Sequence, residues 1–422
     1  MSVFRVGSNK SSVNNFPSVR PTLDLDFANS KTLDPRITFT RASGGSYVGA
    51  DGYIKFAGVN EARFDHDPYT GESLGLLVEE SRTNLITYSE DFVSGWSGNL
   101  NTQVNTDTIL NPYGVLGTVY YITVSELTSS VFNANGLSTL ALSFFSKRRF
   151  GGLNRDFSNI EIFQQSVGGG SLGTYNFRFD GNNPNSGQFQ NIRTERYQND
   201  WYRFSCTLVA RPDYNGGVFG PDARVDLEGG SADNYFWGIQ VESGEFATSY
   251  IPTVGSTRTR AADNASITGK NFREWYRQDE GTFFAQFKTE LNITNNIWSI
   301  NNYPATTFGT INNYFRLLTI SNSIHTQYNV GGTNLYPQFS LTNNNFQKVI
   351  QSYNINSSPI ISALNGTIGT GSGNIYATSP GFNQLEFGKN TDQRTTIGQY
   401  TISRLSYYQK RLTNAQLQAL TK

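Results

Sequence analysis

The chain is dominated by short segments in which apolar and polar side chains alternate. Residues 21–27 (PTLDLDF) and residues 281–290 (GTFFAQFKTE) show this pattern clearly. A period of two is typical of a β-strand with one buried face, because successive side chains of a strand point to opposite sides. Glycine accounts for 41 of the 422 residues and aromatic residues for 14%, which favours strands and turns over helices. The sequence therefore predicts an all-β protein.

Strand-length segments recur along the whole chain, and turn-rich stretches separate them. A chain of 422 residues exceeds the usual size of one hydrophobic core, so we expect tandem antiparallel β-sandwich (jelly-roll) domains. Residues 412–421 combine helix formers with an apolar side and predict one short C-terminal helix, with Thr413 as its cap. The expected units are an extended N-terminal arm (1–20), a small β unit (21–94), a β-sandwich (95–253), a connector (254–280) and a second β-sandwich (281–422).

The charge balance and the lack of apolar segments indicate which partners the protein is not expected to have. Thirty-three basic and 33 acidic residues cancel, which argues against nucleic acid and against anionic membrane surfaces as partners. No segment approaches the length of a membrane span, and the first residues do not resemble a signal peptide. We therefore expect no membrane insertion, and synthesis in a cytoplasm without secretion through a signal peptide.

Catalytic constellations are not apparent in the sequence. Cys206, the one cysteine, lies in a strand-like context and is expected to be a buried structural thiol. His66 and His325 lie far apart and outside metal-ligand spacings, and no phosphate loop or nucleophile elbow is present. The acids of the last module are mostly solitary: Glu274, Asp279, Glu280, Glu290, Glu386 and Asp392. We expect a protein that is not an enzyme and has no cofactor.

Three phrases resemble known proteins. Residues 74–92 (LGLLVEESRTNLITYSEDF), preceded by residues 62–73 (ARFDHDPYTGES), resemble a signature of structural and fibre proteins of tailed bacteriophages. Residues 237–263 (WGIQVESGEFATSYIPTVGSTRTRAAD) are similar to the phrase that closes the following sandwich in those proteins. GTFFAQF at residue 281 and residues 402–420 (ISRLSYYQKRLTNAQLQAL) look like the first and last elements of a concanavalin-A-like, laminin-G-like lectin domain.

This resemblance implies a virion protein of the tail-fibre or appendage type. Residues 1–20 and 21–94 would attach it to other virion proteins, residues 95–253 would be a carbohydrate-binding-like sandwich, and residues 281–422 a lectin-type sandwich. The implied ligand is host-surface polysaccharide, and the implied assembly is a homo-oligomer, with a trimer favoured by analogy with fibres. An alternative is a collar, head or baseplate decoration protein with a purely structural role. A further alternative is a polysaccharide depolymerase, which needs two carboxylates beside the sugar.

Aromatic residues suggest where a sugar could stack. Trp201 and Trp237 lie inside strand phrases and are expected in the sandwich interior. The Asn-rich stretch around residues 298–336 is the better candidate for an exposed glycan surface, because sugar faces pack on aromatic rings. The candidate glycan-binding residues are Trp298, Tyr303, Tyr314, His325, Tyr328 and Tyr336.

One acidic phrase has two interpretations. Asp65, Asp67 and Glu72 supply hard oxygen ligands and could form a cation loop. The plainer interpretation is a hairpin turn, since Asp-Pro and Thr-Gly pairs are typical of turns and aspartates cap local backbone amides. We favour the turn and expect no bound metal.

Overall fold

The structure is a computed structural model. It describes residues 17–98, 102–105, 109–122, 126–149, 157–163, 171–213, 216–221, 223–228, 234–290, 292–302, 313–330, 333–335, 337–341, 343–357, 360–370, 381–389 and 398–422. The chain forms two compact units. Unit 1 contains Met1–Thr40, Leu74–Glu80 and Asp263–Lys422, and unit 2 contains Arg41–Ser73 and Ser81–Ala262. None of the helices in the described part of the chain has the length and apolar character needed to cross a membrane.

Unit 1 is a sandwich of two antiparallel sheets. The first contains, in spatial order, β29 (Thr367–Thr370), β28 (Ile361–Leu364), β27 (Gln347–Asn354), β21 (Glu280–Thr289), β31 (Gln399–Tyr408) and β6 (Ser73–Glu79), and β1 (Leu23–Asp26) also pairs with β31. The second contains β2 (Thr38–Thr40), β20 (Asn264–Thr268), β30 (Gln384–Phe387), β22 (Asn295–Asn301), β23 (Tyr314–Ile320), β24 (Ser323–Val330) and β25 (Thr333–Leu335), and β26 (Gln338–Ser340) also pairs with β24.

The core of unit 1 lies between these sheets. The rings of Phe283 on β21 and Trp298 on β22 stack with their centroids 4.3 Å apart, and the rings of Phe315 and Tyr353 meet at 5.5 Å. β21 and β31, expected to be the first and last strands of the lectin-type sandwich, are direct neighbours in the sheet. Contacts between strands distant in sequence therefore close this unit.

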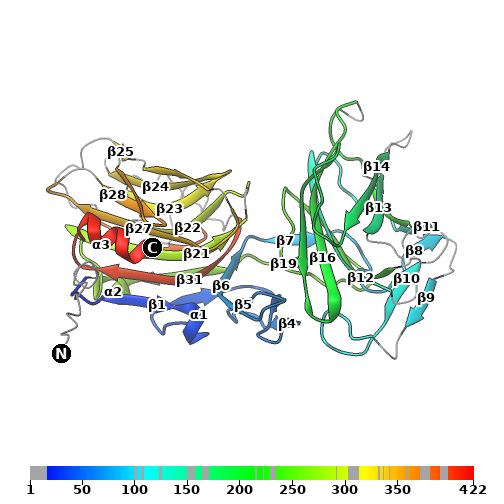
Figure 1. The fold of residues 1–422 in the computed structure, drawn as a ribbon, viewed down its shortest axis with the longest axis horizontal. Coiled ribbons are helices and arrows are strands. Elements are labelled where there is room, and N and C mark those ends of the chain that lie inside the picture. Colours follow the sequence, from blue (N-terminus) through cyan, green and yellow to red (C-terminus); the bar gives the residue numbers. More distant parts are fainter. Residues whose placement is uncertain are drawn as a thin grey trace, which may run out of the picture. The chain divides into compact units, whose positions relative to one another are not determined.

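The helices of unit 1 are short. They are α1 (Phe27–Ser30), α2 (Gly269–Arg273) and α3 (Asn414–Thr421). The predicted C-terminal helix is confirmed as α3, which packs against β27 and β28 (Figure 1). The Thr413 hydroxyl accepts from the amide of Gln416, and the Gln416 side chain accepts from the amide of Thr413. This reciprocal capping box satisfies amides that have no partner inside the helix.

Unit 2 also contains two antiparallel sheets. One contains β15 (Phe189–Arg196), β16 (Trp201–Val209), β12 (Thr139–Arg148), β18 (Asn234–Ser243), β10 (Val119–Ile122) and β9 (Thr102–Asn105). The other contains β14 (Ser171–Arg178), β13 (Phe157–Phe163), β17 (Arg224–Glu228), β11 (Glu126–Ser129) and β8 (Trp96–Gly98). Smaller elements are the hairpin of β3 (Gly45–Val48) and β4 (Ile54–Ala57), the pair of β7 (Arg82–Asn84) and β19 (Arg258–Arg260), strand β5 (Phe64–His66) and the 3₁₀ turn Gln198–Asp200.

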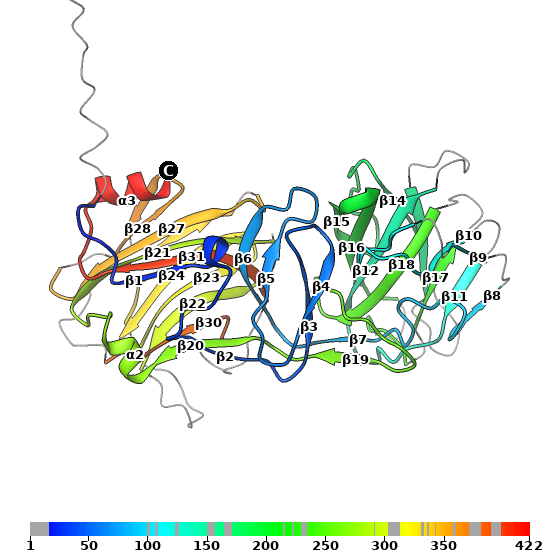
Figure 2. The same ribbon diagram turned by 90° about the horizontal axis from the view of Figure 1, so that it is seen from below.

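Two apolar clusters stabilise unit 2. The larger lies between the sheets and includes Phe144 of β12 and Phe177 of β14, whose ring centroids are 5.1 Å apart. The smaller contains Val48 and Ile54 of the β3–β4 hairpin together with Trp201 and Trp237. The hairpin, visible in Figure 2, therefore packs on the outer face of the sheet that contains β12 and β18.

Several sequence-based predictions about this core are confirmed. The fold is all-β with antiparallel sandwiches. Trp201 and Trp237 are buried in unit 2, but they lie beneath the β3–β4 hairpin and not in the sandwich interior expected from the sequence. Cys206 is a buried free thiol, and burial raises its pKa, which is the behaviour of a structural cysteine.

The division into two units differs from the contiguous domains expected from the sequence. The predicted small unit, residues 21–94, is shared: β1 and β6 belong to unit 1, whereas the β3–β4 hairpin belongs to unit 2. Within the predicted connector, residues 254–280, β19 pairs with β7, and β20 lies between β2 and β30. The alternation within one strand does not reveal its distant partner, and the backbone hydrogen bonds between strands decide which unit it joins. Residues 1–16 of the predicted arm (1–20) lie outside the described residues.

Candidate functional site

Parts of two phrases noted in the sequence, residues 81–92 and 237–262, pair directly in unit 2. Strands β7 and β19 pair antiparallel, and Tyr88 forms a β-bridge with Val254. The Ser89 amide donates to the carbonyl of Thr253 at 3.3 Å, and the Ser89 carbonyl accepts from the amide of Ile239 at 2.9 Å. The two phrases, more than 100 residues apart in sequence, therefore form one scaffold.

Buried polar side chains hold this scaffold together. Asn84 Nδ2 donates to the carbonyl of Ile251 at 2.9 Å, and Gln240 Oε1 accepts from the amide of Ile251 at 2.6 Å. The Glu242 carboxylate accepts from the amide and the hydroxyl of Thr248, at 2.9 and 2.6 Å. Asn84, Gln240 and Glu242 are fully buried. Because a buried polar group is costly unless it is hydrogen-bonded, these contacts fix the path of the chain after β18.

A cavity of about 470 Å³ opens beside this scaffold. Small-molecule sites span roughly 300–1,000 Å³, so the cavity has the size of a ligand pocket. Its walls come from the β3–β4 hairpin, from the loops that carry Glu90 and Tyr113, and from the chain between β18 and β19. The residues that line it are Gly44, Gly45, Ser46, Phe56, Ala57, Glu90, Tyr113, Tyr250, Ile251, Pro252, Val254, Arg258, Thr259 and Arg260.

Two tyrosines hold the carboxylate of the pocket. The Tyr113 hydroxyl donates to Glu90 Oε1, and the Tyr250 hydroxyl lies 3.1 Å from the same oxygen. Burial raises the pKa of Glu90 above that of an ordinary glutamate, while the two tyrosine hydrogen bonds act in the opposite direction. Burial also raises the pKa of both tyrosines, so their hydroxyls remain protonated at neutral pH.

Aromatic rings form the apolar wall of the pocket. The ring of Phe56 is half exposed (51%), and its centroid lies 5.5 Å from that of Tyr113 at an interplanar angle of 59°. Tyr113 in turn packs edge-on against the buried Trp237, with centroids 4.7 Å apart. Because Tyr113 is fixed by this contact and by Glu90, the two rings offer a preformed apolar surface to a ligand.

Strand β19 adds side chains with hydrogen-bond donors to the lining of the pocket. Arg258 and Thr259 belong to β19 and are exposed to solvent. The positive charge of Arg258 acts to lower the pKa of Tyr113, against the larger effect of burial, so its guanidinium lies within electrostatic reach of that hydroxyl. The pocket therefore combines aromatic surface, a carboxylate and a guanidinium, a set that suits a small polar ligand with an apolar face.

The candidates from the sequence do not include Phe56, Glu90, Tyr113 or Tyr250. Glu90 and Tyr250 lie inside the two long phrases noted in the sequence, residues 74–92 and 237–263, and this position was the one signal in the sequence that could have pointed to them. Phe56 and Tyr113 reach the pocket through the folding of distant loops, and nothing in their local sequence distinguishes them from other aromatic residues.

The structure places two of the six aromatic and histidine candidates in the core of unit 1. Trp298 is fully buried and stacks on Phe283, and Tyr328 is 2% exposed and packs against Phe315. Both side chains point inward on strands β22 and β24. A buried ring has no open face for a sugar, so these two residues are corrected from candidate ligand-binding to core positions.

Two other candidates lie on the opposite face of the same sheet, where Tyr314 pairs with Asn329 and His325 pairs with Leu318. Tyr314 on β23 is half-buried, with the Arg316 guanidinium 4.5 Å from its ring centroid. His325 on β24 is also half-buried, and burial together with the charge of Arg316 lowers its pKa. Tyr303 and Tyr336 lie outside the described residues.

The acidic phrase at residues 65–72 forms a turn. Asp67 Oδ1 accepts from the amides of Tyr69 and Thr70, at 3.0 and 2.8 Å. Asp65 Oδ1 accepts from the amide of Val48 at 2.7 Å, and the Glu72 carbonyl accepts from the amide of Asp67 at 2.8 Å. The Asp67 contacts are the local capping that the turn interpretation predicts, whereas Asp65 binds the backbone of the distant strand β3.

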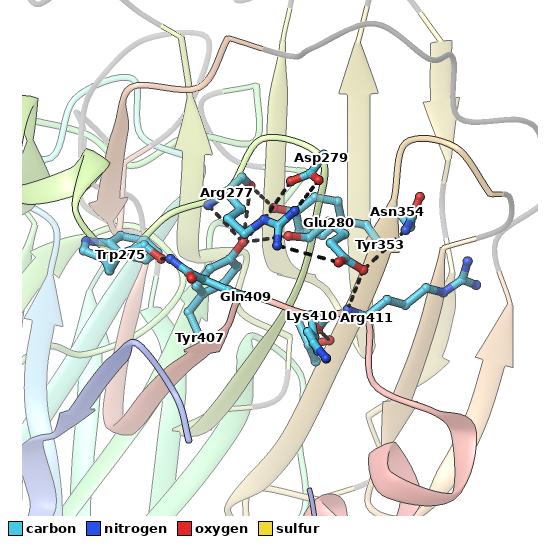
Figure 3. Close-up of polar contacts among 11 residues, drawn as sticks. Trp275, Arg277, Asp279, Glu280, Tyr353, Asn354, Tyr407, Gln409, Lys410 and Arg411 are labelled. Carbon is cyan, nitrogen blue, oxygen red and sulfur yellow. Dashed lines mark hydrogen bonds and ion pairs between the residues drawn. The ribbon is translucent and has the colours of Figure 1, made fainter. Parts of the chain in front are cut away.

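Asp279 and Glu280 belong to a polar cluster at one end of unit 1 (Figure 3). Arg277 forms a two-pronged ion pair with Asp279, which lowers the pKa of that carboxyl, and Glu280 accepts from the amide of Arg411 at 3.3 Å. Behind them the hydroxyls of Tyr353 and Tyr407 contact the carbonyl of Arg277, at 2.7 and 3.2 Å. The cluster fastens the segment before β21 to strands β27 and β31.

The remaining acids of the last module also have local partners. Glu386 Oε2 accepts from Asn301 Nδ2 at 2.9 Å and Oε1 lies 3.2 Å from Lys389 Nζ. Glu290 accepts from Asn344 Nδ2, and Glu274 lies 3.6 Å from Lys270 on the surface. Asp392 lies outside the described residues.

No protein-family model and no curated protein sequence matches the chain. Among solved structures, the chain is similar to the CBM40 module of the IT-sialidase of Ruminococcus gnavus, solved with α2,3-sialyllactose, at 17% identity and a TM-score of 0.30 over 34% of this chain and 84% of that chain. It is also similar to the NanB sialidase of Streptococcus pneumoniae (13% identity, TM-score 0.31, 37% of this chain and 26% of that chain). A third similar structure is a SAP-like pentraxin of Limulus polyphemus (14% identity, TM-score 0.28, 34% and 70%). Similarity at this level assigns no activity to the chain.

Proposed function

We propose that this chain is a non-catalytic adhesion protein that binds glycan in the pocket of unit 2. The observation that supports the proposal is the combination of a half-exposed Phe56, a fixed Tyr113 and the carboxylate of Glu90 around one cavity of about 470 Å³. A sugar ring has an apolar face of C–H groups and an edge of hydroxyls. The aromatic wall suits the face, and the carboxylate suits the hydroxyls as a strong acceptor.

The setting that we propose is the particle of a tailed bacteriophage. The resemblance of residues 62–92 and 237–263 to phage structural and fibre proteins supports this setting. Residues 1–20 would then contact other virion proteins, and the sandwiches would face host-surface polysaccharide. A homo-oligomer, most simply a trimer, would repeat a weak contact and convert it into firm adsorption, because linked sites bind together far more tightly than one site alone.

Binding without cleavage is part of the proposal. Most glycoside hydrolases place two carboxylates on opposite sides of the scissile bond. In this pocket the carboxylate of Glu90 is held by Tyr113 and Tyr250, an arrangement that suits it to accept hydrogen bonds from a ligand. We therefore expect incubation with a bound polysaccharide to release no reducing ends.

The test is a glycan array probed with the full-length chain and two variants. Phe56→Ala removes the exposed ring of the pocket and should weaken binding roughly tenfold or more, as loss of a central aromatic contact does. Tyr69→Ala is the matched control, because Tyr69 is also half exposed (50%) in unit 2 but lies outside the residues that line the pocket. It should bind like the unmodified chain.

Two results would count against this function. An array on which the folded, full-length chain binds no glycan would remove its basis. Equal loss of binding in Phe56→Ala and Tyr69→Ala, or in neither variant, would place the glycan site elsewhere on the molecule.

A further inference from the structure

The hydroxyl of Tyr250 contacts two oxygen atoms beside the pocket. It lies 3.1 Å from Glu90 Oε1 and 2.8 Å from Ser89 Oγ. The hydroxyl carries one proton, and a carboxylate is a stronger acceptor than a serine oxygen. When Glu90 is ionised, Tyr250 therefore donates to it, and the Ser89 hydroxyl can donate to the Tyr250 oxygen.

The backbone holds Ser89 in place. Its amide donates to the carbonyl of Thr253 at 3.3 Å, and its carbonyl accepts from the amide of Ile239 at 2.9 Å. Ser89 Oγ also accepts from the amide of Thr253 at 2.8 Å. Because this amide fixes the oxygen, a chain of hydrogen bonds runs from the backbone through two hydroxyls to the carboxylate of Glu90.

Packing fixes the ring of Tyr250 as well. The side chain is only 3% exposed. Its ring centroid lies 4.9 Å from that of Trp237 and 6.0 Å from that of Phe145. Core side chains are packed closely, so the ring cannot turn without disturbing these neighbours. Both the ring and the hydroxyl of Tyr250 are therefore preset in the folded chain.

This chain of hydrogen bonds acts on one oxygen of Glu90. The hydroxyls of Tyr113 and Tyr250 both contact Oε1 and not Oε2, and an ionised carboxylate can accept about four hydrogen bonds. Burial raises the pKa of Glu90, whereas the hydrogen bonds from the two tyrosines act to lower it. The hydroxyls thus oppose the cost of burying the charge, and they orient a carboxylate that lines the cavity.

Resting on the proposed function, we infer that Tyr250 and Ser89 are positioning residues of the glycan pocket. Their hydroxyls hold Glu90 as an ionised acceptor and leave its Oε2 for a hydroxyl of the sugar. Tyr113 also donates to Glu90, but its ring belongs to the aromatic wall, so its replacement would change two contacts at once. The hydroxyl of Tyr250 is the cleaner test of this role.

The first experiment measures the ionisation of Glu90 without a ligand. Carbon-13 NMR of the chain, labelled at its glutamate carboxyl carbons, follows the titration, and Glu90→Gln assigns the signal. Tyr250→Phe keeps the ring and removes the hydroxyl. The midpoint of Glu90 should rise by about one pH unit, because a hydrogen bond to a charged group stabilises the ionised form. Ser89→Ala should move the midpoint in the same direction by a smaller amount.

The control variant is Tyr235→Phe. Tyr235 packs in the same apolar cluster as Tyr250 but does not line the pocket. The other titratable and charged groups beside Glu90 are Tyr113, Asp91 next to it in sequence, and Arg258 and Arg260 of β19, which line the same cavity. All of them are the same in both variants, so a difference between the variants reports the lost hydroxyl.

The second experiment measures sugar binding by the same variants. The saccharide that binds best on the glycan array is titrated by saturation-transfer NMR between pH 7.5 and 4.5. Tyr250→Phe should lose affinity at a higher pH than the unmodified chain. The difference should widen to about tenfold as the pH falls and narrow toward pH 7.5. A merely structural role of Tyr250 would weaken binding equally at every pH.

The outcomes separate this inference from the proposed function. If Glu90 titrates at the same pH in Tyr250→Phe and Tyr235→Phe, or if binding weakens equally at every pH, the inference is wrong while glycan binding stands. If the array shows no bound glycan, the proposed function fails and the positioning role fails with it. Ser89→Ala keeps the ring and the hydroxyl of Tyr250, so it still decides the question if Tyr250→Phe does not fold.

Discussion

Glu90 shows how a single residue takes its properties from its surroundings. The carboxylate is mostly buried beside Tyr113 and Tyr250, and burial raises its pKa. In the unfolded chain, Glu90 would be an ordinary, hydrated glutamate. In the pocket it is a strong acceptor whose charge is easier to remove, because loss of water disfavours the ionised form.

This property predicts a pH dependence of binding. The ligand hydroxyls donate to the ionised carboxylate, so affinity should fall as pH is lowered through the raised pKa of Glu90. The fall should begin above the ordinary glutamate value of 4.5. The neighbouring tyrosines have pKa values raised by burial, so neither of them titrates in this range. Titration of the bound sugar between pH 7.5 and 4.5 measures the effect.

Glu90→Gln is the control for this pH dependence. The amide cannot titrate, so the affinity of the variant should stay level while that of the unmodified chain falls. A parallel fall in both proteins would assign the pH dependence to another group and would contradict the role of Glu90.

At the level of single residues, the sequence predicts burial better than it predicts a binding surface. Trp201 and Trp237 follow strand patterns and are buried as predicted, although beneath the β3–β4 hairpin and not between the two sheets. Trp298 and Tyr328 also sit on strands, β22 and β24, but the many asparagines around them resemble loop sequence. Those asparagines lie partly on the other face of the same strands, for example Asn301 against Glu386. A polar strand face and a loop have similar composition. For this reason the sequence suggests an exposed surface for Trp298 and Tyr328, although both rings are buried.

Among the elements, β18 and the chain that follows it position the side chains of the pocket. Gly238 lies where the pairing of β12 with β18 shifts register, and its φ is +63°. A bulge of this kind turns the strand and re-aims the side chains beside it. Here it lies next to Trp237, which supports Tyr113, and against Tyr250, which holds Glu90.

Replacement of Gly238 by alanine should destabilise unit 2. The new Cβ would lie 3.0 Å from the Phe145 ring and 3.3 Å from the Tyr250 ring, in a left-handed backbone conformation. The conformation costs about 1–2 kcal/mol, and crowding in a packed core adds about 1–3 kcal/mol. Urea denaturation followed by intrinsic fluorescence measures the change in the free energy of unfolding.

Gly181→Ala isolates the cost of the backbone conformation. Gly181 also has a positive φ, +79°, but its Cβ would meet no atom within 4 Å. This variant should therefore lose only about 1–2 kcal/mol. If Gly238→Ala were no less stable than Gly181→Ala, the rings around Gly238 would not be as tightly packed as the structure indicates.

The elements themselves are largely predictable, whereas their partners are not. Alternation identifies β1 and β21, and capping by Thr413 identifies α3. The short strands β7 and β19 carry no clear alternation, and they form because their backbones pair with each other. The local pattern of side chains indicates which residues are buried, but it does not indicate which distant segments pair.

At the scale of the whole molecule, each unit is assembled from separated parts of the chain. Unit 1 gathers three segments and unit 2 gathers two. Residues 81–92 and 237–262 lie far apart in the sequence, and together they build the scaffold of the pocket in unit 2. A domain map that follows the sequence in order cannot contain such a site.

The most direct measurement of the central claim is an experimental structure of the chain with the saccharide that binds best on the array. We predict the sugar in the cavity of unit 2, with its ring against Phe56 and a hydroxyl oxygen about 2.5–2.7 Å from Glu90 Oε2. A sugar bound at another surface, such as the face that carries Tyr314 and His325, with the cavity of Glu90 free of ligand, would contradict the account.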